Sequence, residues 1–441
     1  MGIMTSSSKA DSPVMIGFVG MTHLGIVSAA SVAAKGFNTI CCDSDRELIA
    51  GLVAGKTPVN EPGLDDLIRS NRERQCFTTD LGRLAECDIV YISTDVPTDN
   101  AGRSDLRAIS VFIEAVSKVL KPDGLLIVLC QVPPGFTRAI GAVAHERLYY
   151  QAETLVLGRA VVRALHPERT IVGCADASKP LDRRYFALLS AFGCPLLPMR
   201  YESAELAKIA INCCLVSSIS VANTLSELCE NIGADWSEIV PALKLDARIG
   251  QFAYLLPGLG IAGGNLERDL ATVVSLSERH RTNFDVVRAW LSSSRHRRDW
   301  AGRTIRTALL SERPEALVAV WGLAYKEDTD STKNSPSLAT LTDLPQTRFA
   351  VHDPVVRADA IAHAHLTKVT EPLDALTNAD ALMIMTPWPQ YRDISVHDVA
   401  KGLRGRIVLD PYRVLEPRAA AAAGLDYYSL GLPHEPAAEI A

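Results

Sequence analysis

A glycine-rich turn with the spacing of a phosphate-binding loop lies near the start of the chain, at Gly20-Met-Thr-His-Leu-Gly25. In a strand–turn–helix unit, the first glycine of such a turn allows a sharp bend, and the last lets the helix approach the strand closely. The N-terminus of the helix then presents unpaired N–H groups, which favour a pyrophosphate. The pattern therefore predicts a dinucleotide-binding turn, with Gly20, Thr22 and Gly25 as cofactor-binding residues.

A carboxylate stands where the second strand of this unit is expected to end. Asp43 follows the apolar run 37–42, roughly twenty residues beyond the turn. From this position an acidic side chain accepts hydrogen bonds from the ribose 2′-hydroxyl, whereas a 2′-phosphate is repelled. We therefore expect Asp43 to bind the cofactor, and NAD to be preferred over NADP.

Thr22 departs from the usual pattern, which has glycine at this position so that the backbone can come close to the phosphates. A β-branched side chain is expected to narrow that gap. Because the motif is degenerate, the prediction of a dinucleotide site depends on the strands and helices around it.

Strand and helix signals alternate along both ends of the chain. The first strand signals lie at residues 14–19, 37–42, 87–93 and 125–130, and the second series lies at 316–325, 348–353, 381–386 and 406–410. The helical segment after the turn closes at Gly36, a residue type typical of a helix C-terminus. Such alternation predicts a parallel, doubly wound sheet in each half.

The middle of the chain has a different pattern. Residues 203–231 contain no glycine or proline and repeat apolar residues at helical spacing, which predicts one long central helix with two buried faces. We favour packing against a partner subunit, and burial inside its own domain is the alternative. The loop-rich stretch 250–269 contains glycines that suit a backbone wrapped around a ligand.

These patterns together predict an α/β fold with two Rossmann-like doubly wound domains joined by a helical middle domain. The expected divisions are a flexible tail at 1–13, an NAD-binding domain at 14–202, a central helical dimerisation and substrate domain at 203–305, and a C-terminal nucleotide-sugar-binding domain at 306–441. A chain of 441 residues is long enough for two or three hydrophobic cores.

Composition excludes several classes of function. The net charge of −6 gives no electrostatic reason to expect nucleic acid, and we interpret the basic cluster 295–298 as a solvated helix end. The ten cysteines show no metal-ligand spacing, so we expect buried thiols in a reducing compartment and no metal site. No apolar run is expected to span a membrane, and residues 1–13 lack an apolar export signal, which favours the cytoplasm.

A series of further motifs resembles the UDP-glucose/GDP-mannose dehydrogenase family, the nucleotide-sugar 6-dehydrogenases, over nearly the whole chain. They occur in the order of the family. They are Glu61-Pro-Gly-Leu64, Pro97-Thr98-Asp99, Val132-Pro133, His166-Pro167-Glu168-Arg169, Ala204-Glu-Leu-Ala-Lys208 with Asn212, Asp246-Ala-Arg248-Ile-Gly250, Gly258-x-Gly260, Asp269, Gly322-Leu-Ala-Tyr-Lys326, Ser335-Pro-Ser337 and Thr386-Pro-Trp388.

The resemblance implies a dimer, formed by the central helix, that oxidises the C6 alcohol of a nucleotide-activated hexose with NAD. It implies catalytic roles for Lys208, Asn212, Asp269 and Glu153, the first two facing the reacting oxygen and Glu153 activating water. It adds cofactor contacts from Pro97, Thr98, Gln131 and Lys333. It also implies substrate contacts from Glu153, Lys208, Asn212, Arg248, Gly260, Asn265, Lys326 and Arg413, with Arg248 reaching the nucleotide bound to the partner subunit.

Each of these residues also has a purely structural interpretation. Lys208 could be a surface lysine on a helix, Asn212 an amide in the core, and Asp269 the N-cap of a helix. Their joint occurrence at the family positions favours the functional interpretation.

The most consequential departure from the family is Asn265, which stands where the family has its catalytic cysteine. That thiolate attacks the intermediate aldehyde and prepares the second hydride transfer, and an amide cannot do this. Rescue by Cys213 or Cys214 is disfavoured, because neighbouring helical residues point about 100° apart. Gln131 replaces a threonine, and Lys333 replaces an arginine and so lacks its bidentate fork.

Three hypotheses of function follow. The leading one is NAD-dependent oxidation of a UDP-glucose-type sugar for polysaccharide biosynthesis, stopping at the two-electron carbonyl stage, or continuing through a hydrated aldehyde with Glu153 activating water. The second is redox-neutral, epimerase-like turnover with bound NAD. The third is a non-catalytic nucleotide-sugar-binding protein.

Overall fold

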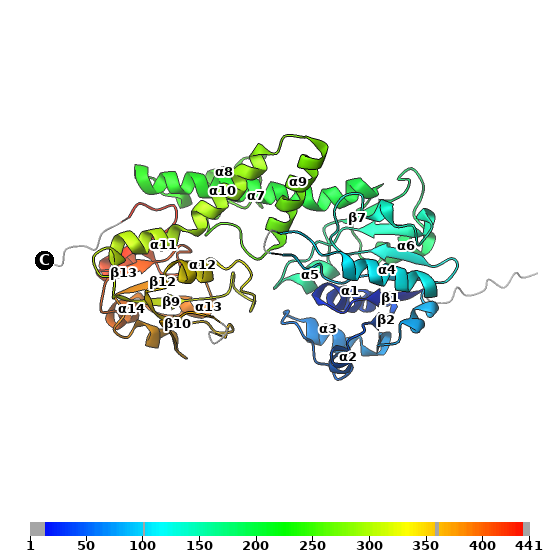
Figure 1. The fold of residues 1–441 in the computed structure, drawn as a ribbon, viewed down its shortest axis with the longest axis horizontal. Coiled ribbons are helices and arrows are strands. Elements are labelled where there is room, and N and C mark those ends of the chain that lie inside the picture. Colours follow the sequence, from blue (N-terminus) through cyan, green and yellow to red (C-terminus); the bar gives the residue numbers. More distant parts are fainter. Residues whose placement is uncertain (1–13, 100–101, 358–360, 435–441) are drawn as a thin grey trace, which may run out of the picture. The chain divides into compact units, whose positions relative to one another are not determined.

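The computed structural model describes residues 14–99, 102–357 and 361–434, and the tail expected at 1–13 lies outside these residues. The chain divides into two compact units, one up to Ala210 and one beginning at Ile211. The boundary lies inside the long helix α7 (Tyr201–Ile232). Each unit is built around one sheet (Figure 1). The domain limits expected at residues 202 and 305 remain predictions.

The first unit contains an eight-stranded sheet in the order β3-β2-β1-β4-β5-β6-β7-β8. Its strands are β1 (Met15–Val19), β2 (Asn38–Cys42), β3 (Gln75–Thr78), β4 (Ile89–Ile92), β5 (Leu125–Val128), β6 (Leu148–Gln151), β7 (Thr170–Cys174) and β8 (Leu196–Arg200). The chain moves outward from β1 in one direction and then from β4 in the other. This is the doubly wound order, and its switch point between β1 and β4 is where such sheets bind ligands.

The expectation of a wholly parallel first sheet is wrong at one place. Strand β6 pairs with β7 in the antiparallel sense, while all other neighbours in this sheet are parallel. An apolar strand pattern carries no direction, because direction depends on the path of the connection between the strands. The sequence therefore could not reveal this reversal.

Helix α1 (His23–Ala34) follows the glycine-rich turn, and nine of its twelve residues are buried. Alanines and serines dominate its sequence, and small side chains let a helix lie close to a sheet. Gly36, just beyond its end, has a φ of 95°, as expected for a helix terminated by a left-handed glycine. The other helices of this unit are α2 (Arg46–Val53), α3 (Leu64–Ser70), α4 (Arg107–Val119), α5 (Ala160–Leu165) and α6 (Arg183–Ser190).

The second unit contains a six-stranded sheet in the order β11-β10-β9-β12-β13-β14, with all neighbours parallel. Its strands are β9 (Leu317–Trp321), β10 (Arg348–His352), β11 (Leu366–Lys368), β12 (Ala381–Ile384), β13 (Ile407–Leu409) and β14 (Asp426–Tyr428). Helices α12 (Pro336–Asp343), α13 (Pro389–Arg392), α14 (Val396–Gly402) and α15 (Pro417–Ala422) connect them. The second doubly wound sheet predicted from the sequence is thus confirmed.

The remaining helices of the second unit are α8 (Trp236–Leu245), α9 (Asn265–His280), α10 (Asp285–Arg298) and α11 (Trp300–Ile305), and α11 continues into a π-helical turn at Arg306–Leu310. Helix α9 begins inside the stretch 250–269, so the last five residues of that predicted loop are helical. A left-handed Gly264, with a φ of 113°, precedes the helix and ends the loop.

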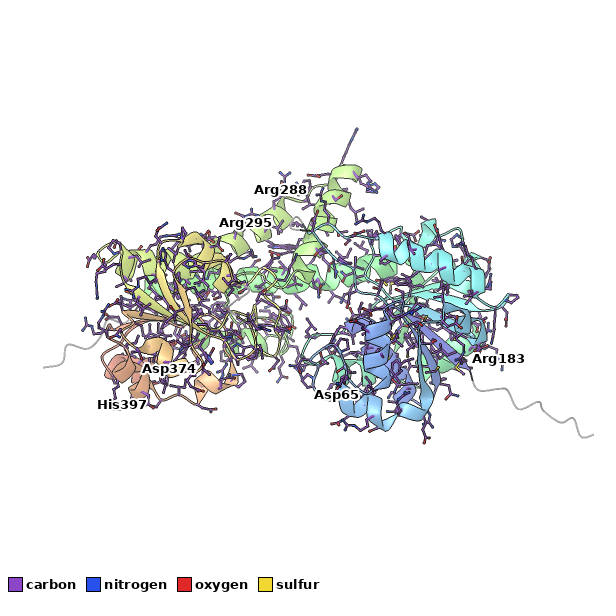
Figure 2. All side chains as sticks on the ribbon, turned by 60° about the horizontal axis from the view of Figure 1, so that its bottom comes forward. Asp65, Arg183, Arg288, Arg295, Asp374 and His397 are labelled. Carbon is purple, nitrogen blue, oxygen red and sulfur yellow. The ribbon has the colours of Figure 1, made fainter. Side chains whose placement is uncertain are left out.

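The basic cluster at the end of α10 is not simply a solvated helix end. Arg297 is 1% exposed and forms an ion pair with Glu230 of α7. Arg298 pairs with Glu267 of α9 at 2.6 Å. Arg295 does lie at the surface of α10, where Figure 2 labels it. Two of these arginines thus form ion pairs between helices with acidic residues that lie far away in the sequence.

Helix α7 also corrects the expectation about membrane-spanning runs. By length and composition it is apolar enough to cross a bilayer, with a mean hydropathy of 1.5 in its most apolar window. Within the fold, however, Asn212 and Glu230 of this helix make polar contacts with α9 and α10. Such contacts are typical of a helix packed inside a protein.

All ten cysteines are free thiols, as the sequence predicts. Six of them are buried, but Cys214 is exposed on α7, so the expectation of a uniformly buried set is wrong there. Among the described residues, no group of three or more histidine, cysteine or acidic side chains is arranged to hold a metal ion.

The contact between α1 and β1 yields a first prediction. A Cβ on Gly25 would lie 1.9 Å from the carbonyl oxygen of Gly20, so Gly25→Ala must push the helix away from the strand. We expect a loss of about 1–3 kcal/mol of stability and weaker stabilisation by NAD, measured as melting temperature with and without NAD. Gly141→Ala is the matched control, because its Cβ would meet no atom within 4 Å. Equal melting of the two variants would contradict the close contact.

Candidate active site

The glycine-rich turn has the steric features expected of a phosphate cradle. Gly20 has a φ of 91°, and a Cβ there would lie 2.7 Å from the Cβ of Thr94, which follows β4. Gly25 allows the helix to lie close to the carbonyl oxygen of Gly20, because a Cβ at this position would be only 1.9 Å from that oxygen. Both glycines therefore play the steric roles predicted from their spacing.

Thr22 is the N-cap residue of α1, but its side chain makes no capping hydrogen bond. Its hydroxyl instead accepts a hydrogen bond of 2.8 Å from the N–H of Asp95, in the loop after β4. The threonine therefore ties the turn to that loop rather than capping the helix. The first-turn N–H groups of α1, which have no side-chain cap, are thus directed toward a ligand position.

Asp43 lies at the end of β2, directly beside the turn. One of its carboxylate oxygens accepts the N–H of Met21 at 2.7 Å, and the other accepts the N–H of Asp45 at 3.0 Å. These bonds orient the carboxylate at the carboxyl edge of the sheet. Three features therefore fit a dinucleotide such as NAD. They are the glycine turn, which has no room for side chains at its two glycines, the uncapped start of α1, and this carboxylate.

Three further predicted cofactor residues lie at the same edge of the first sheet. The carbonyl of Pro97 accepts the N–H of Asp105 at 2.9 Å, and Thr98 forms a β-bridge with Ser104, so both belong to a structured loop after β4. Gln131 follows β5. Lys333 belongs to the second unit, where its carbonyl accepts the N–H of Gly263 at 3.0 Å.

The structure brings Glu153 and Lys208 together in the first unit. The carboxylate of Glu153 lies 3.8 Å from the ammonium of Lys208, and the two side chains are only 18% and 12% exposed. Because little water surrounds them, their attraction is stronger than that of a surface pair. A carboxylate and an ammonium in contact at a partly closed place can accept a proton and stabilise a developing negative charge.

A second polar pair lies in the second unit. The amide nitrogen of Asn212 donates a hydrogen bond of 2.5 Å to the carboxylate of Asp269, which is 1% exposed. Asp269 lies inside α9 and is not its N-cap, so that structural interpretation is wrong. Asn212 follows Lys208 by one turn of α7, which places both on one face of that helix.

Asn265 is the first residue of α9, at the helix N-terminus, and lies on the same face as Asp269 by its i, i+4 spacing. The preceding turn is tightly packed. A Cβ on Gly263 would lie 2.8 Å from the ring of Tyr325, and one on Gly260 would lie 2.4 Å from the carbonyl oxygen of Ser294. The backbone of 260–264 is therefore fixed, and it presents an amide where the resemblance expects a thiol.

The three basic residues expected to contact substrate have different environments. Arg248 is 89% exposed in its side chain and pairs with Asp246 at 2.6 Å. Arg413 pairs with Asp235 at 2.8 Å and borders a cavity of about 440 Å³ in the second unit. The ammonium of Lys326 lies 5.8 Å from the ring centroid of Tyr325. Their substrate contacts remain predictions.

Three models of one family match the chain, and together they cover most of it. The NAD binding domain of the UDP-glucose/GDP-mannose dehydrogenase family matches residues 14–186, its central domain matches 202–295, and its UDP binding domain matches 319–417. The chain belongs to the UDP-glucose/GDP-mannose dehydrogenase family.

Proteins similar to this family member over nearly their whole length include UDP-glucose 6-dehydrogenases. The TuaD protein of Bacillus subtilis is 26% identical over 433 residues, which cover 95% of this chain and 93% of that protein. The Pseudomonas aeruginosa protein is 28% identical over 440 residues, covering 94% and 97%. A UDP-glucose dehydrogenase structure from Pyrobaculum islandicum has a TM-score of 0.82 at 25% identity, covering 97% of this chain and 100% of that one.

As a member of this family, the chain is an NAD-dependent oxidoreductase of the nucleotide-sugar dehydrogenase type, acting on CH–OH groups. The resemblance drawn from its motifs is confirmed, and so is NAD as the cofactor. Strands β10 to β13 of its second unit lie within the stretch that matches the UDP binding domain of the family.

Two buried carboxylates in this dehydrogenase were not predicted as site residues. Glu205 of α7 accepts the N–H groups of Gly135 at 2.6 Å and Thr137 at 2.8 Å, in the loop after β5. Burial raises the pKa of this carboxyl, although the hydrogen bond to Thr137 opposes that rise. Glu61 is the second, and its carboxylate accepts the N–H groups of Gly158 and Ala160. Both lie inside motifs that carry the family resemblance, and this position in a motif was the signal that the sequence offered.

The turn of this dehydrogenase yields a second prediction, which concerns Thr22. Thr22→Val keeps the shape of the side chain but removes the hydroxyl that holds the Asp95 N–H. We expect NAD to bind about three- to tenfold more weakly, since one hydrogen bond of about 1 kcal/mol is lost, as measured by isothermal titration calorimetry. Thr22→Ser retains the hydroxyl and is expected to bind NAD as the unmodified protein does. An unchanged affinity in the valine variant would show that this tie does not shape the cofactor site.

Proposed function

We propose that this chain oxidises the C6 alcohol of a UDP-glucose-type nucleotide sugar with NAD. The observation that carries the proposal is the pair of polar contacts one helical turn apart on α7, Lys208 with Glu153 and Asn212 with Asp269. The UDP-glucose 6-dehydrogenases that it resembles, and the UDP binding domain of its family, support the substrate class.

In this proposal the two contacts have separate tasks. Lys208 stabilises the negative charge that develops on the alcohol oxygen as its proton leaves, and the amide of Asn212 donates a hydrogen bond to the same oxygen. Asp269 orients that amide by accepting its other N–H. NAD, when bound, supplies the hydride acceptor, and Glu153 is the carboxylate that can accept a proton from water.

Asn265 limits how far the oxidation proceeds. An amide nitrogen has no free lone pair, so no covalent intermediate forms at the start of α9. Cys213 does not supply the missing thiolate, because burial raises the pKa of its thiol to about 11 and the charge of Asp269 adds to that rise. We therefore propose that the reaction stops at the aldehyde, which releases one NADH and one proton for each alcohol.

A second outcome is favoured by one specific observation. Glu153 remains in contact with Lys208 although position 265 has no cysteine, so the carboxylate can activate a water that adds to the aldehyde. The hydrate then carries a C–H from which a second hydride can leave, giving the carboxylate product. This route needs two NAD for each sugar.

The stoichiometry of NADH separates these possibilities and is the third prediction. The purified protein is incubated with NAD and a panel of nucleotide sugars, and the NADH formed per sugar consumed is counted. We expect one; two would establish the route through the hydrate. Product without NADH would mean redox-neutral turnover, and binding without product would mean a binding protein, and either result would overturn the dehydrogenase proposal.

Two variants control that measurement. Lys208→Met removes the ammonium and keeps the length of the side chain, and we expect at least a hundredfold loss of NADH formation. Asn265→Cys restores the thiol, and the count is expected to rise from one to two. A count that stays at one would show that the residue at this position does not limit the oxidation.

We also propose that the protein is a homodimer formed through α7. Val221, Leu225, Leu228 and Ile232 are 48%, 41%, 51% and 64% exposed. Their spacing of three or four residues forms one apolar stripe along the helix, which we call the α7 stripe. Continuous exposed apolar surface of this kind is typical of an interface between subunits.

The substrate class supports a cytoplasmic location, where activated sugars are made.

The fourth prediction tests the α7 stripe. The double variant Leu225→Glu with Leu228→Glu places two charges on it, and we expect a monomer in sedimentation velocity where the unmodified protein is a dimer. Val111→Glu, at a 62% exposed position on α4, is the matched control and is expected to remain dimeric. A double variant that stays dimeric would place the interface elsewhere.

A further inference from the structure

Glu61 is a buried carboxylate held by a rigid turn in the first unit. Its side chain is fully buried. Its backbone carbonyl accepts the N–H of Leu64 at 3.1 Å, and Gly63 between them has a φ of 79°. Leu64 begins α3 and is 1% exposed in the core. The turn and this apolar anchor therefore fix the position from which the carboxylate reaches out.

Three donors surround this carboxylate, and they come from two separate segments. One oxygen accepts the ring Nε2 of His23 and the N–H of Gly158, each at 3.0 Å. The other oxygen accepts the N–H of Ala160 at 2.7 Å. Hydrogen bonds to a buried carboxylate are stronger than hydrogen bonds between neutral groups. The loss of one such bond leaves a buried oxygen or N–H group without a partner, which costs stability. Glu61 is thus a strong bridge between its two neighbours.

The first segment is the cofactor turn. His23 is the first residue of α1, within the turn at which the pyrophosphate is expected to lie. Its side chain is 15% exposed, so most of the ring is enclosed near Glu61. A dinucleotide that orders the first turn of α1 must therefore also order the ring that contacts this carboxylate.

The second segment is the loop that carries Glu153. Residues 152–159 connect β6 to α5, and Glu61 holds the end of that loop at Gly158 and the first residue of α5, Ala160. A side chain of α5 holds its start, because Arg163 donates to the carbonyl of Thr154 at 2.9 Å. The position of Glu153, 3.8 Å from Lys208, therefore depends on the anchors of this loop.

We propose that Glu61 is a positioning residue that couples cofactor binding at α1 to the placement of the Glu153 loop. The inference rests on the proposed function in one respect, which is the role of Glu153 as the carboxylate that accepts a proton from water. Ordering of His23 by the cofactor strengthens the hold of Glu61 on the loop through one contiguous set of hydrogen bonds. Because such coupling is reciprocal, an ordered loop also raises the affinity for the cofactor.

Hydrogen–deuterium exchange of the full chain, with and without saturating NAD, tests the coupling. We expect NAD to slow exchange in the peptide 153–163 of the unmodified protein on the order of fivefold or more. His23→Phe keeps an aromatic ring of slightly larger size without its nitrogen atoms, and it leaves the bonds from Gly158 and Ala160 to Glu61 in place. In this variant NAD should still protect the peptide 20–26, but its effect on 153–163 should fall below about twofold.

Glu61→Gln tests the other half of the bridge, because one acceptor oxygen becomes a donor that faces N–H groups. We expect faster exchange in 153–163 even without NAD, and a loss of kcat larger than the rise in the KM for NAD. Glu86→Gln, which changes an exposed carboxylate paired with Arg83, is the matched control and should exchange as the unmodified protein does.

The outcomes are separable from those of the proposed function, since exchange requires bound NAD but no turnover. Protection of 20–26 by NAD without any change in 153–163 of the unmodified protein would overturn the coupling. So would an undiminished effect of NAD in His23→Phe, or a Glu61→Gln loop that exchanges as slowly as the Glu86→Gln control. A failure to oxidise any nucleotide sugar would leave the coupling intact and remove only the task of Glu153.

Discussion

The first unit depends on a backbone contact between helix α1 and strand β1 that only glycine permits. At Gly25 the helix lies so close to the carbonyl of Gly20 that any side chain would collide with it. This contact directs the uncapped start of α1 toward the carboxyl edge of the sheet, between β1 and β4. Asp43, the Thr22 hydroxyl and the loop after β4 then assemble around that start. The helix dipole and the N–H groups supply the positive potential for the cofactor, so the fold itself, rather than a cluster of basic side chains, makes the anion site.

The second unit repeats this construction with a different result. Gly322 follows β9 with a φ of 97°, and a Cβ there would lie 2.4 Å from Thr386, as at Gly20 and Thr94 in the first sheet. The carboxylate after β10, Asp353, is 6% exposed and accepts four backbone N–H groups and the indole N–H of Trp388. In the first unit the corresponding Asp43 accepts two N–H bonds and remains half-buried. The same topology thus leaves the carboxylate after the second strand partly accessible in the first sheet and fully satisfied by the fold in the second.

The polar groups proposed for catalysis are mostly paired before any substrate arrives. Lys208 contacts Glu153, and Asn212 donates to Asp269. Such pairing fixes the orientation of each group, which is the condition for stabilising charge in a transition state without reorganisation. Asn265 fits this polar environment, since an amide can donate and accept hydrogen bonds at the start of α9. In the proposed function it removes only the nucleophile, which would separate the geometry of the first hydride transfer from the chemistry of the second.

The sequence by itself determined the positions of four strands in each half, the glycines at Gly20 and Gly25, the carboxylate Asp43 and the missing thiol at Asn265. These features are local, because each depends on residue types at fixed short spacing along the chain. Motif order added the family and named Lys208, Asn212, Asp269 and Glu153, although not their partners. Only the tertiary structure decided that Glu153 meets Lys208, that Arg297 is buried against Glu230 and that β6 runs opposite to β7. It also decided that Glu61 joins the first turn of α1 to the loop before α5. Such contacts join residues far apart in the sequence, and no local pattern encodes which distant donor a buried carboxylate will find.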